Sequence, residues 1–399
     1  MLRFVAPAGA PLKMTQVFCA LKAVFSSNGD MEECLTSLAA LLKVRHVFGI
    51  SSGRAALWLI LKSLCRLQPN RRVVAVPAYT CFSVPASIVR SGLKLHPLEI
   101  DPETLDFDFS QLESLPREEL LCILTSNLFG LVNDVSRVRE IARAKGAFLV
   151  DDAAQAFGAS RNGSFAGTRG DVGFYSLARG KSLASVEGGI IVTNSEEIAR
   201  AIHAEAADLP RSSFPHTARL LLRMVTYATF LKPWLYWVPN SLPFLKLGIT
   251  EFAPDFPTAH LANLSGALLP QLMGQLVEVN EIRCKNAMAI ANGLAANACF
   301  VAPKPAADCQ PSYIRFPLIA RDEATRHRAI SRLRAAGIGA SSFYPSAICD
   351  IAGIEPYMVS GDFHRPRAEA LSHTLLTLPT HPYVRPQDLS RMIDILNKL

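Results

Sequence analysis

Between about Val44 and Asn194, short runs of β-branched and apolar residues alternate with stretches in which apolar residues recur every three or four positions. The short runs indicate buried strands, and the stretches between them indicate amphipathic helices. Strands that alternate with helices are typical of a parallel sheet with crossover helices. The candidate strands are Val73–Val76, Lys94–Ile100, Leu120–Thr125, Ala147–Asp151, Val172–Ser176 and Gly189–Thr193.

One helix of this region is marked at both ends. Asn133 is a candidate N-cap, and Gly146 stands where the pattern stops. Between them, Val135, Val138 and Ile141 fall on one helical face. The sequence therefore predicts a helix that begins at Asn133 and ends just before Gly146.

A second α/β region begins near residues 312–318, with a helix near Asp322–Ala336 and a last helix near Pro386–Leu399. A chain of 399 residues exceeds the roughly 250 to 300 that one core supports. We therefore expect an α/β fold with two domains. Residues 1–258 would form an N-terminal arm and a large domain with a mostly parallel sheet, and residues 259–399 a connecting helix and a small C-terminal α/β domain.

The segment 216–248 is crowded with large apolar residues, and Arg219, Arg223 and Lys232 interrupt it. Three prolines in its second half would break a continuous helix. Because no charge-free run approaches the roughly 20 residues that a spanning helix needs, we expect no membrane span. Two interpretations stay open: helical packing or a subunit contact, and an interfacial hairpin that reaches the bilayer surface or a lipid-linked substrate.

Composition narrows the class of protein. Half of the residues are hydrophobic and 19% are charged, which excludes a disordered chain. The net charge is +7, but Lys and Arg are spread along the chain, which favours phosphorylated small molecules over nucleic acid. Nine cysteines without a C-x-x-C pair or metal-ligand spacing favour a reducing compartment and no metal site. With no signal-peptide pattern, we expect a cytoplasmic protein, with membrane association through residues 216–248 as the alternative.

The candidate chemistry lies within residues 149–189. Asp151 and Asp152 follow a predicted buried strand, at the position where open α/β sheets bind ligands. A carboxylate there can keep a pyridine nitrogen protonated, and we expect Asp151 to be structural. Lys181 follows the strand that ends at Ser176. A lysine in such a loop can form an imine with an aldehyde cofactor and then transfer a proton.

Two glycine-containing turns accompany these residues. Glu187-Gly188-Gly189 opens the next strand and permits close backbone approach. Upstream, Ser51-Ser52-Gly53 precedes a helical pattern. The free N–H groups of such a helix N-terminus suit a phosphate, although the motif alone is an ordinary helix cap.

Taken in order, these motifs resemble the fold-type I sugar aminotransferases of the DegT/StrS type, which depend on pyridoxal 5'-phosphate. The resemblance runs from about Gly29 to the C-terminus. It implies a homodimer that transfers an amino group from an amino acid, usually glutamate, to a keto sugar. In the family this sugar is commonly nucleotide-linked and serves polysaccharide, glycolipid or secondary-metabolite biosynthesis. The matching blocks are Ser52-Gly53, Val76-Pro77-Ala78-Tyr79-Thr80, Asp101-Pro102-Glu103-Thr104-Leu105, Phe129-Gly130, Asp151-Asp152-Ala153-Ala154-Gln155-Ala156, Gly170-Asp171-Val172-Gly173, Lys181 with Glu187-Gly188-Gly189, Gln271-Leu272 and Leu378-Pro379-Thr380-His381-Pro382.

The resemblance also implies roles for individual residues. Lys181 would be the Schiff-base lysine, Asp152 the partner of the pyridinium nitrogen, and Gln155 a neighbour of the ring. We expect Tyr344 and His381 to pack within the small domain rather than to act in the site. The phosphate-binding residues that the resemblance implies are Ser176, Gly53, Arg54 and Ala55.

Several positions depart from the family pattern. Arg54 stands where relatives commonly have Thr, and Cys81, followed by Phe82, stands where they place an aromatic that stacks on the cofactor. Arg179 could bind the phosphate or an anionic part of the substrate. Phe256-Pro257-Thr258 replaces the region from which a partner subunit's Asn and basic residue reach the phosphate.

Alternatives to sugar transamination therefore stay open. One is a pyridoxal phosphate enzyme that acts on a lipid-linked or non-sugar substrate. Another is a non-catalytic homologue with a binding or regulatory role. Sugar deoxygenation is disfavoured, because relatives of that type tend to replace the lysine that this chain keeps at Lys181.

Overall fold

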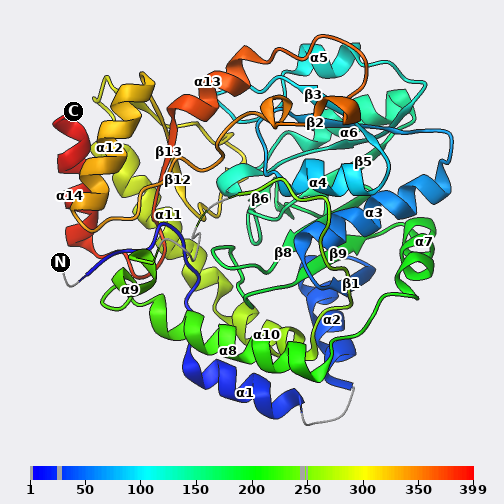
Figure 1. The fold of residues 1–399 in the computed structure, drawn as a ribbon, viewed down its shortest axis with the longest axis horizontal. Coiled ribbons are helices and arrows are strands. Elements are labelled where there is room, and N and C mark those ends of the chain that lie inside the picture. The colour runs from blue at the N-terminus through cyan, green and yellow to red at the C-terminus, as the bar shows by residue number, and fades with distance from the viewer. Residues whose placement is uncertain (1–2, 25–28, 243–247, 249) are drawn as a thin grey trace.

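The computed structural model describes residues 3–24, 29–242, 248 and 250–399. At its centre is a seven-stranded sheet in the order β1-β9-β8-β5-β4-β2-β3 (Figure 1). This arrangement confirms the predicted α/β fold with a mostly parallel sheet. All six predicted strands are present, with ends that differ by no more than two residues. The strands are β1 (His46–Ile50), β2 (Val73–Pro77), β3 (Lys94–Leu98), β4 (Leu120–Leu124), β5 (Phe148–Asp152), β8 (Val172–Ser176) and β9 (Gly189–Thr193).

Two details of the sheet were not predicted. Strand β1 was not among the predicted strands, and it forms one edge of the sheet by pairing with β9. Strand β9, whose direction the sequence left open within a mostly parallel sheet, runs antiparallel to both β1 and β8. The reason is that residues 177–188 between β8 and β9 contain no helix, so the chain turns back instead of crossing over.

Helices cover both faces of the sheet. Along β2, Val74 and Val76 pack into the same core as α3 and α4, whereas Val73 and Ala75 pack into the core of α5 and α6 on the other face. Side chains of a strand alternate between its two faces, so β2 is buried from both sides. The helices that flank the sheet are α3 (Gly53–Leu67), α4 (Ser83–Arg90), α5 (Phe109–Ser114), α6 (Val135–Lys145) and α7 (Glu196–Ala206).

Helix α6 matches the predicted helix except at its cap. The N-cap is Asp134, whose side chain accepts a hydrogen bond from Arg137 N, and not Asn133. Asn133 Oδ1 instead accepts a hydrogen bond from the backbone of Ser126, so its side chain is used in the buried loop beside β4. Gly146 ends the helix in a left-handed conformation, as predicted.

The C-terminal part contains a smaller antiparallel sheet in the order β10-β12-β13. A third sheet consists of three strands of two residues each. They are β6 (Ser160–Arg161), β7 (Ser164–Phe165) and β11 (Cys309–Gln310). The two predicted C-terminal helices correspond to α12 and α14. The division of the chain at residue 258 stays a prediction. The elements of the C-terminal part are α10 (Asn263–Gly274), α11 (Leu276–Gly293), β10 (Phe300–Val301), β12 (Phe316–Ala320), α12 (Glu323–Ala335), α13 (Pro366–Thr374), β13 (Leu375–Leu378) and α14 (Pro386–Asn397).

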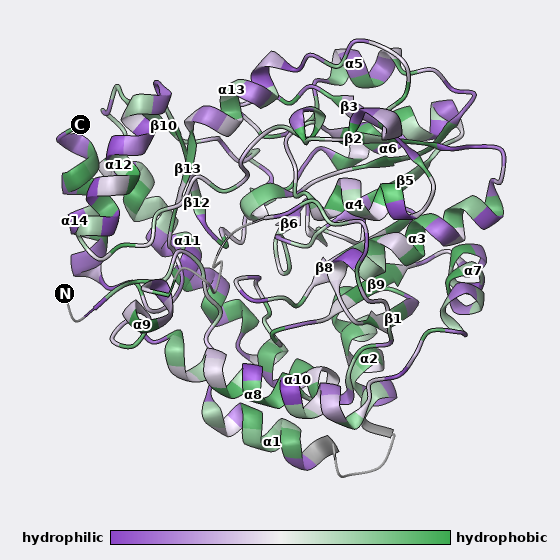
Figure 2. Ribbon diagram, in the orientation of Figure 1, coloured by the Kyte–Doolittle hydropathy of each residue, from purple (hydrophilic) through white to green (hydrophobic). Residues whose placement is uncertain are grey.

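The apolar segment forms α8 (Phe214–Phe230) and the short α9 (Trp237–Asn240), and α1 (Met14–Val24) lies beside α8 (Figure 1). Residues 243–247 of this segment lie outside the described residues. In the described part of the chain, no helix is both long enough and apolar enough to cross a bilayer. Helix α2 (Gly29–Leu42) packs against α10 and β1. In Figure 2, hydrophobic residues occupy much of α1 and α8.

Candidate active site

A cavity of about 220 Å³ lies at the carboxyl ends of the central parallel strands. Its walls come from the N-terminus of α3 and from the residues that follow β2, β4, β5 and β8. This is the edge at which parallel sheets bind ligands, because the loops after adjacent strands converge there. Six of the predicted site residues line it: Gly53, Arg54, Asp152, Gln155, Ser176 and Lys181.

Asp152 is the last residue of β5 and is buried. Its Oδ1 accepts a hydrogen bond of 2.8 Å from Ala154 N. Burial raises the pKa of this carboxyl to about 7, although the Ala154 N–H and the charge of Lys181 act in the opposite direction. These two groups therefore do not offset the cost of burying the charged carboxylate, and a cation placed in the cavity would stabilise it.

Asp151 has a different environment, as expected for a structural residue. Its side chain points into the protein and accepts hydrogen bonds from Thr125 Oγ1 at 3.1 Å, Asn127 Nδ2 at 2.8 Å and Gly167 N at 2.7 Å. These donors fix the loops after β4 and β5, so Asp151 holds the frame in which Asp152 is presented.

Lys181 lies in the loop between β8 and β9. Its backbone N–H donates to Ala178 O, and Ala178 forms a bridge with Val186 across the loop. Burial lowers the pKa of the Lys181 amine, while Cys81 and Asp152 raise it. A larger share of this amine is therefore neutral than of an exposed lysine, and a neutral amine is the nucleophilic form.

The N-terminus of α3 faces the same cavity. Ser52 caps the helix by accepting a hydrogen bond of 3.1 Å from Ala55 N. The N–H groups of Gly53 and Arg54 precede that bond and have no acceptor within the helix. A Cβ atom on Gly53 would lie 2.9 Å from the Cβ of Ser176, so glycine lets the helix approach the end of β8. Ala55 is fully buried and is not part of the lining.

Arg54 is partly turned toward the neighbouring loop. Its guanidinium carbon lies 5.0 Å from the centre of the Phe256 ring, and the Arg54 carbonyl accepts a hydrogen bond from Ser87 Oγ. The side chain thus lines the cavity and also lies over the ring of Phe256.

Gln155 links the cavity to the C-terminal part. Its Oε1 accepts a hydrogen bond of 3.1 Å from Phe129 N, and its Nε2 donates one of 2.8 Å to the Tyr344 hydroxyl. Tyr344 also packs against Tyr79, with ring centres 5.4 Å apart. Tyr344 therefore contacts a residue of the site, whereas His381 is fully buried and bonded to Ala6 O.

Among the lining residues to which the sequence gave no role are Thr80, Ser126, Asn127 and Ala154. Asn127 Nδ2 donates to Asp151 Oδ1 and, at 2.6 Å, to the carbonyl of Asp152, so it orients both residues. The hydroxyls of Thr80 and Ser126 lie 3.0 Å apart. Ser126 and Asn127 follow a predicted strand, which places them at the carboxyl end of the sheet. This position could have identified them as site residues from the sequence.

Three residues at positions that depart from the family pattern, Cys81, Phe82 and Arg179, differ in their surroundings. Cys81 lines the cavity and accepts a hydrogen bond from Ser83 Oγ, whereas Phe82 packs in the core beneath α3 and α4. Arg179 is exposed and is not part of the lining.

A second cation lies close enough to Lys181 to affect it. Arg315 lowers the pKa of the Lys181 amine, and burial in turn lowers the pKa of Arg315 to about 10. Arg315 Nη1 donates to Ser341 Oγ at 2.7 Å, and its guanidinium lies 5.1 Å from the centre of the Phe343 ring. In the described part of the chain no carboxylate forms an ion pair with it.

Helix α8 of the apolar segment also reaches the lysine loop. Glu187, which ends that loop, lies 2.9 Å from His216 Nε2 and 3.6 Å from Arg223 Nη1. The segment is therefore packed against the loop that carries Lys181. Among the described residues, no group of His, Cys, Asp and Glu side chains has the arrangement of a metal site.

Most of the chain is similar to one family of known proteins. The sequence profile of the DegT/DnrJ/EryC1/StrS aminotransferase family matches residues 13–211 and 257–397. The unmatched stretch between them contains α8 and α9.

Relatives and solved structures agree with the match. The chain is 33% identical over 163 residues to a pleiotropic regulatory protein of Geobacillus stearothermophilus, covering 41% of this chain and 43% of the relative. It is 35% identical over 182 residues to L-glutamine:2-deoxy-scyllo-inosose aminotransferase of Streptoalloteichus tenebrarius, covering 45% of this chain and 42% of the relative. The chain thus spans less than half the length of these relatives.

Similarity to a solved structure covers the whole fold. The Escherichia coli GDP-4-keto-6-deoxy-D-mannose-3-dehydratase with bound hydrated pyridoxal phosphate superposes with a TM-score of 0.79 at 19% identity. The superposition covers 99% of this chain and all of the dehydratase chain. At this identity the likeness establishes the fold.

Proposed function

The chain belongs to the DegT/DnrJ/EryC1/StrS aminotransferase family, which depends on pyridoxal phosphate and includes sugar aminotransferases, and on that premise we propose that it transfers an amino group from glutamate to a nucleotide-linked keto sugar. The observation that carries the proposal is one cavity in which a lysine amine, a buried carboxylate and a helix N-terminus meet. We further propose that the protein acts as a homodimer.

The residues of the cavity fit pyridoxal 5'-phosphate. Asp152 is a buried carboxylate that lacks a cationic neighbour strong enough to restore its ordinary pKa, and a protonated pyridine nitrogen would supply one. The N–H groups of Gly53 and Arg54, with Ser176, suit a phosphate. When bound, the cofactor supplies an aldehyde that combines with amines and a ring that accepts electrons.

Lys181 has two tasks in this proposal. Its amine, made less basic by burial, would be the group that holds the cofactor. The same amine would take a proton from one carbon of the substrate and return it to another. Both tasks need a neutral amine, which is the form that the surroundings favour.

The amino donor carries a carboxylate, and Arg315 is a cation near Lys181 that could receive it. Glutamate and glutamine are both candidates, since one relative is named for glutamine. Conversion of the bound cofactor by each amino acid, tested in turn, identifies the donor.

A non-catalytic role is the second candidate, because one relative carries the name of a regulatory protein. The intact Lys181 and Asp152 argue against it. A further alternative is a pyridoxal phosphate enzyme that acts on a lipid-linked or non-sugar substrate. The packing of the apolar helix α8 against the lysine loop is the observation that favours it.

The decisive experiment is reductive trapping. The protein is incubated with pyridoxal phosphate, reduced with borohydride, digested, and examined by mass spectrometry. We expect a covalent mass increment on the peptide that contains Lys181, loss of the increment in Lys181→Ala, and bleaching of the absorbance band by an amino donor. Labelling of wild type and Lys181→Ala to the same extent, or no band in either, would overturn the catalytic proposal in favour of a binding role.

A further inference from the structure

The segments 3–24 and 209–242, which include α1, α8 and α9 and which we call the basic apolar face, have an unusual charge distribution. The described residues 3–24 and 209–242 contain seven Lys and Arg residues and no Asp or Glu. Seven is also the net charge of the whole chain, so the remaining residues are close to neutral. The excess charge that looked evenly spread in the sequence is concentrated in two segments that pack together.

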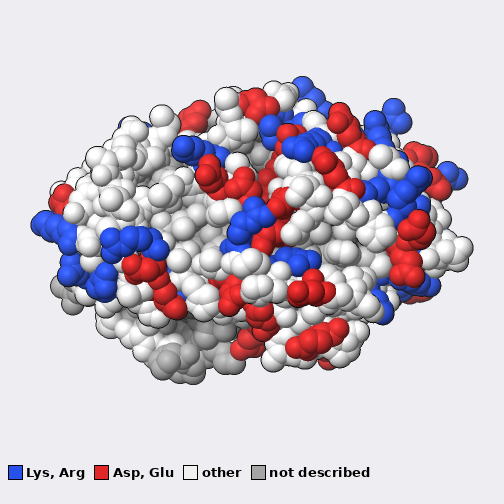
Figure 3. Space-filling view, turned by 90° about the horizontal axis from the view of Figure 1, so that it is seen from above, with Lys and Arg blue, Asp and Glu red and all other residues white. Residues whose placement is uncertain are grey.

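Not all of this charge is compensated within the protein. Arg3 pairs with Asp388 and Arg223 lies near Glu187, which uses two of the seven cations. The other five have no ion pair among the described residues: Lys13, Lys22, Arg211, Arg219 and Lys232. By contrast, acidic and basic side chains are interspersed on the opposite side of the molecule, above α5 and α13 (Figure 3).

Large apolar side chains are exposed on the same elements. Along α8, Leu220 and Met224 turn inward, while Phe214 and Leu222, two turns apart, share the outer face. On α1, Phe18 precedes Lys22 by one turn. The exposed fractions are 58% for Phe18, 82% for Phe214, 66% for Leu222, 59% for Trp234 and 43% for Trp237.

Apolar and aromatic side chains beside lysine and arginine, without acidic residues, are what an anionic lipid surface attracts. Tryptophan in particular prefers the boundary between headgroups and acyl chains. We propose that the basic apolar face binds the surface of an anionic bilayer peripherally, with Phe18, Leu222 and Trp234 entering the headgroup region.

The face is continuous with the active-site region. Tyr236 lies between the two exposed tryptophans; burial raises the pKa of its hydroxyl, and Arg315 and Arg179 are near enough to act in the opposite direction. The N-terminal segment joins the same group, because the Phe4 ring stacks on Tyr236 at 6.0 Å. A protein held by this face would keep the cavity near the bilayer, where an acceptor carried on a lipid could reach it.

Vesicle co-sedimentation of the full-length protein tests the proposal without requiring turnover. We expect binding to phosphatidylcholine vesicles that contain phosphatidylglycerol, weaker binding at high salt, and little binding to phosphatidylcholine alone. The double variant Lys22→Glu/Arg219→Glu should lower the partition coefficient by at least about tenfold. The matched control Arg117→Glu/Arg143→Glu has the same change in net charge at exposed positions elsewhere and should bind as wild type does.

Fluorescence provides a second measurement. The chain has three tryptophans, and two of them, Trp234 and Trp237, lie on the face. In a Trp58→Phe variant, emission should therefore shift to shorter wavelength when anionic vesicles are added, and Leu222→Glu should reduce the shift.

Three outcomes would overturn the proposal. The first is no binding of wild type to anionic vesicles, and the second is equal loss of binding in both double variants, which would indicate a net-charge effect only. The third is that the wild-type protein does not bind vesicles but forms an oligomer, and that Leu222→Glu dissociates this oligomer in sedimentation velocity. That result would assign the face to a contact between copies of this chain.

Discussion

Asp152 shows how the site is set up at the scale of a single residue. Its carboxyl has a pKa raised to about 7 by burial, against an ordinary value near 3.9. A raised acid pKa means that ionisation costs folding free energy. The cost begins as the pH rises above about 4, grows until about pH 7, and is complete above that, where it amounts to as much as about 4 kcal/mol.

We therefore expect Asp152→Asn to stabilise the cofactor-free protein at about pH 8 by up to about 4 kcal/mol, and by much less at about pH 5. The amide keeps an oxygen that can accept from Ala154 N but cannot ionise. Urea unfolding at the two pH values measures the difference. Asp394→Asn, at an exposed position of α14, is the control and should show no such dependence. A pH-independent effect of Asp152→Asn would show that burial does not penalise this carboxylate.

At this scale the sequence was informative where chemistry is local. Lys181 and Asp152 were predicted because each stands at or just after a strand end, and Ser176 was predicted from the family resemblance; all three line one cavity. Ala55 was assigned with its neighbours but does not line the cavity, since its N–H is used by the Ser52 cap. Arg315 could not be predicted, because its position near Lys181 depends on how the C-terminal part packs on the sheet.

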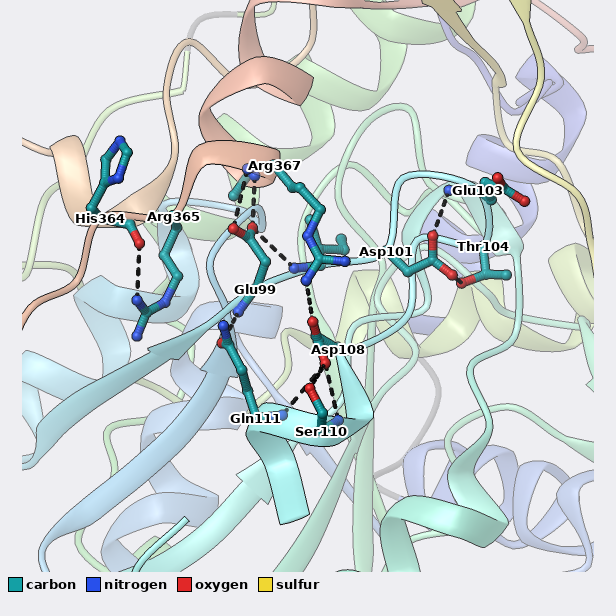
Figure 4. Close-up of polar contacts among 12 residues, drawn as sticks. Glu99, Asp101, Glu103, Thr104, Asp108, Ser110, Gln111, His364, Arg365 and Arg367 are labelled. Carbon is teal, nitrogen blue, oxygen red and sulfur yellow. Dashed lines mark hydrogen bonds and ion pairs between the residues drawn. The ribbon is translucent and has the colours of Figure 1, made fainter. Parts of the chain in front are cut away.

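At the scale of elements, one carboxylate joins the edge of the large sheet to a helix of the C-terminal part. Glu99 follows β3 and is buried. Its oxygens accept hydrogen bonds of 3.1 Å from Arg367 N and 2.8 Å from Ala368 N, in the first turn of α13 (Figure 4). The Arg367 side chain also pairs with Asp108. A carboxylate at a helix N-terminus accepts hydrogen bonds from the free N–H groups, and its negative charge is stabilised by the positive end of the helix dipole.

We expect Glu99→Gln to destabilise the protein by about 1 to 3 kcal/mol, because an amide cannot accept from both N–H groups and its own NH₂ would face a donor. Thermal or urea unfolding measures the loss. Glu103→Gln, an exposed neighbour, is the matched control and should cost no more than about 0.5 kcal/mol. If both variants lose the same amount, Glu99 does not cap α13.

Element prediction succeeded where periodicity decides and failed where pairing decides. The ends of β8 and β9 were correct to the residue, whereas the direction of β9 depended on the absence of a helix in the lysine loop. Strand β1 was missed, since only its pairing with β9 makes it a strand. The cap of α6 moved by one residue because the side chain of Asn133 is engaged by Ser126 N.

At the scale of the whole molecule, the N-terminal segment fastens the C-terminal part to the rest. Val5 pairs on both sides with the backbone around Ile338. Ala6 O accepts a hydrogen bond of 2.8 Å from His381 Nε2, and Gly9 O accepts one of 3.0 Å from Arg283 Nη2. These partners lie hundreds of residues away, and the segment has no periodicity, so the sequence alone predicted only an arm.

His381 and Arg283 are both fully buried, and burial lowers the pKa of His381 to about 4 and that of Arg283 to about 10. Removing residues 1–10 would leave both side chains without these acceptors. A buried donor that loses its acceptor costs about 1 to 3 kcal/mol, and more when it is charged. We therefore expect the truncated protein to lose at least about 3 kcal/mol of stability, measured by urea unfolding.

Arg3→Ala separates this effect from the loss of surface contacts. It removes the ion pair with Asp388 and the 3.1 Å hydrogen bond from Arg3 Nη2 to the carbonyl of Tyr383. Because the Arg3 side chain is 26% exposed, the loss should be about 1 kcal/mol. If truncation costs no more than Arg3→Ala, then water or nearby groups satisfy His381 and Arg283, and the segment is an attached tail. A much larger cost would mean that residues 3–10 belong to the core of the C-terminal part, although in the sequence they precede the strands of the large sheet.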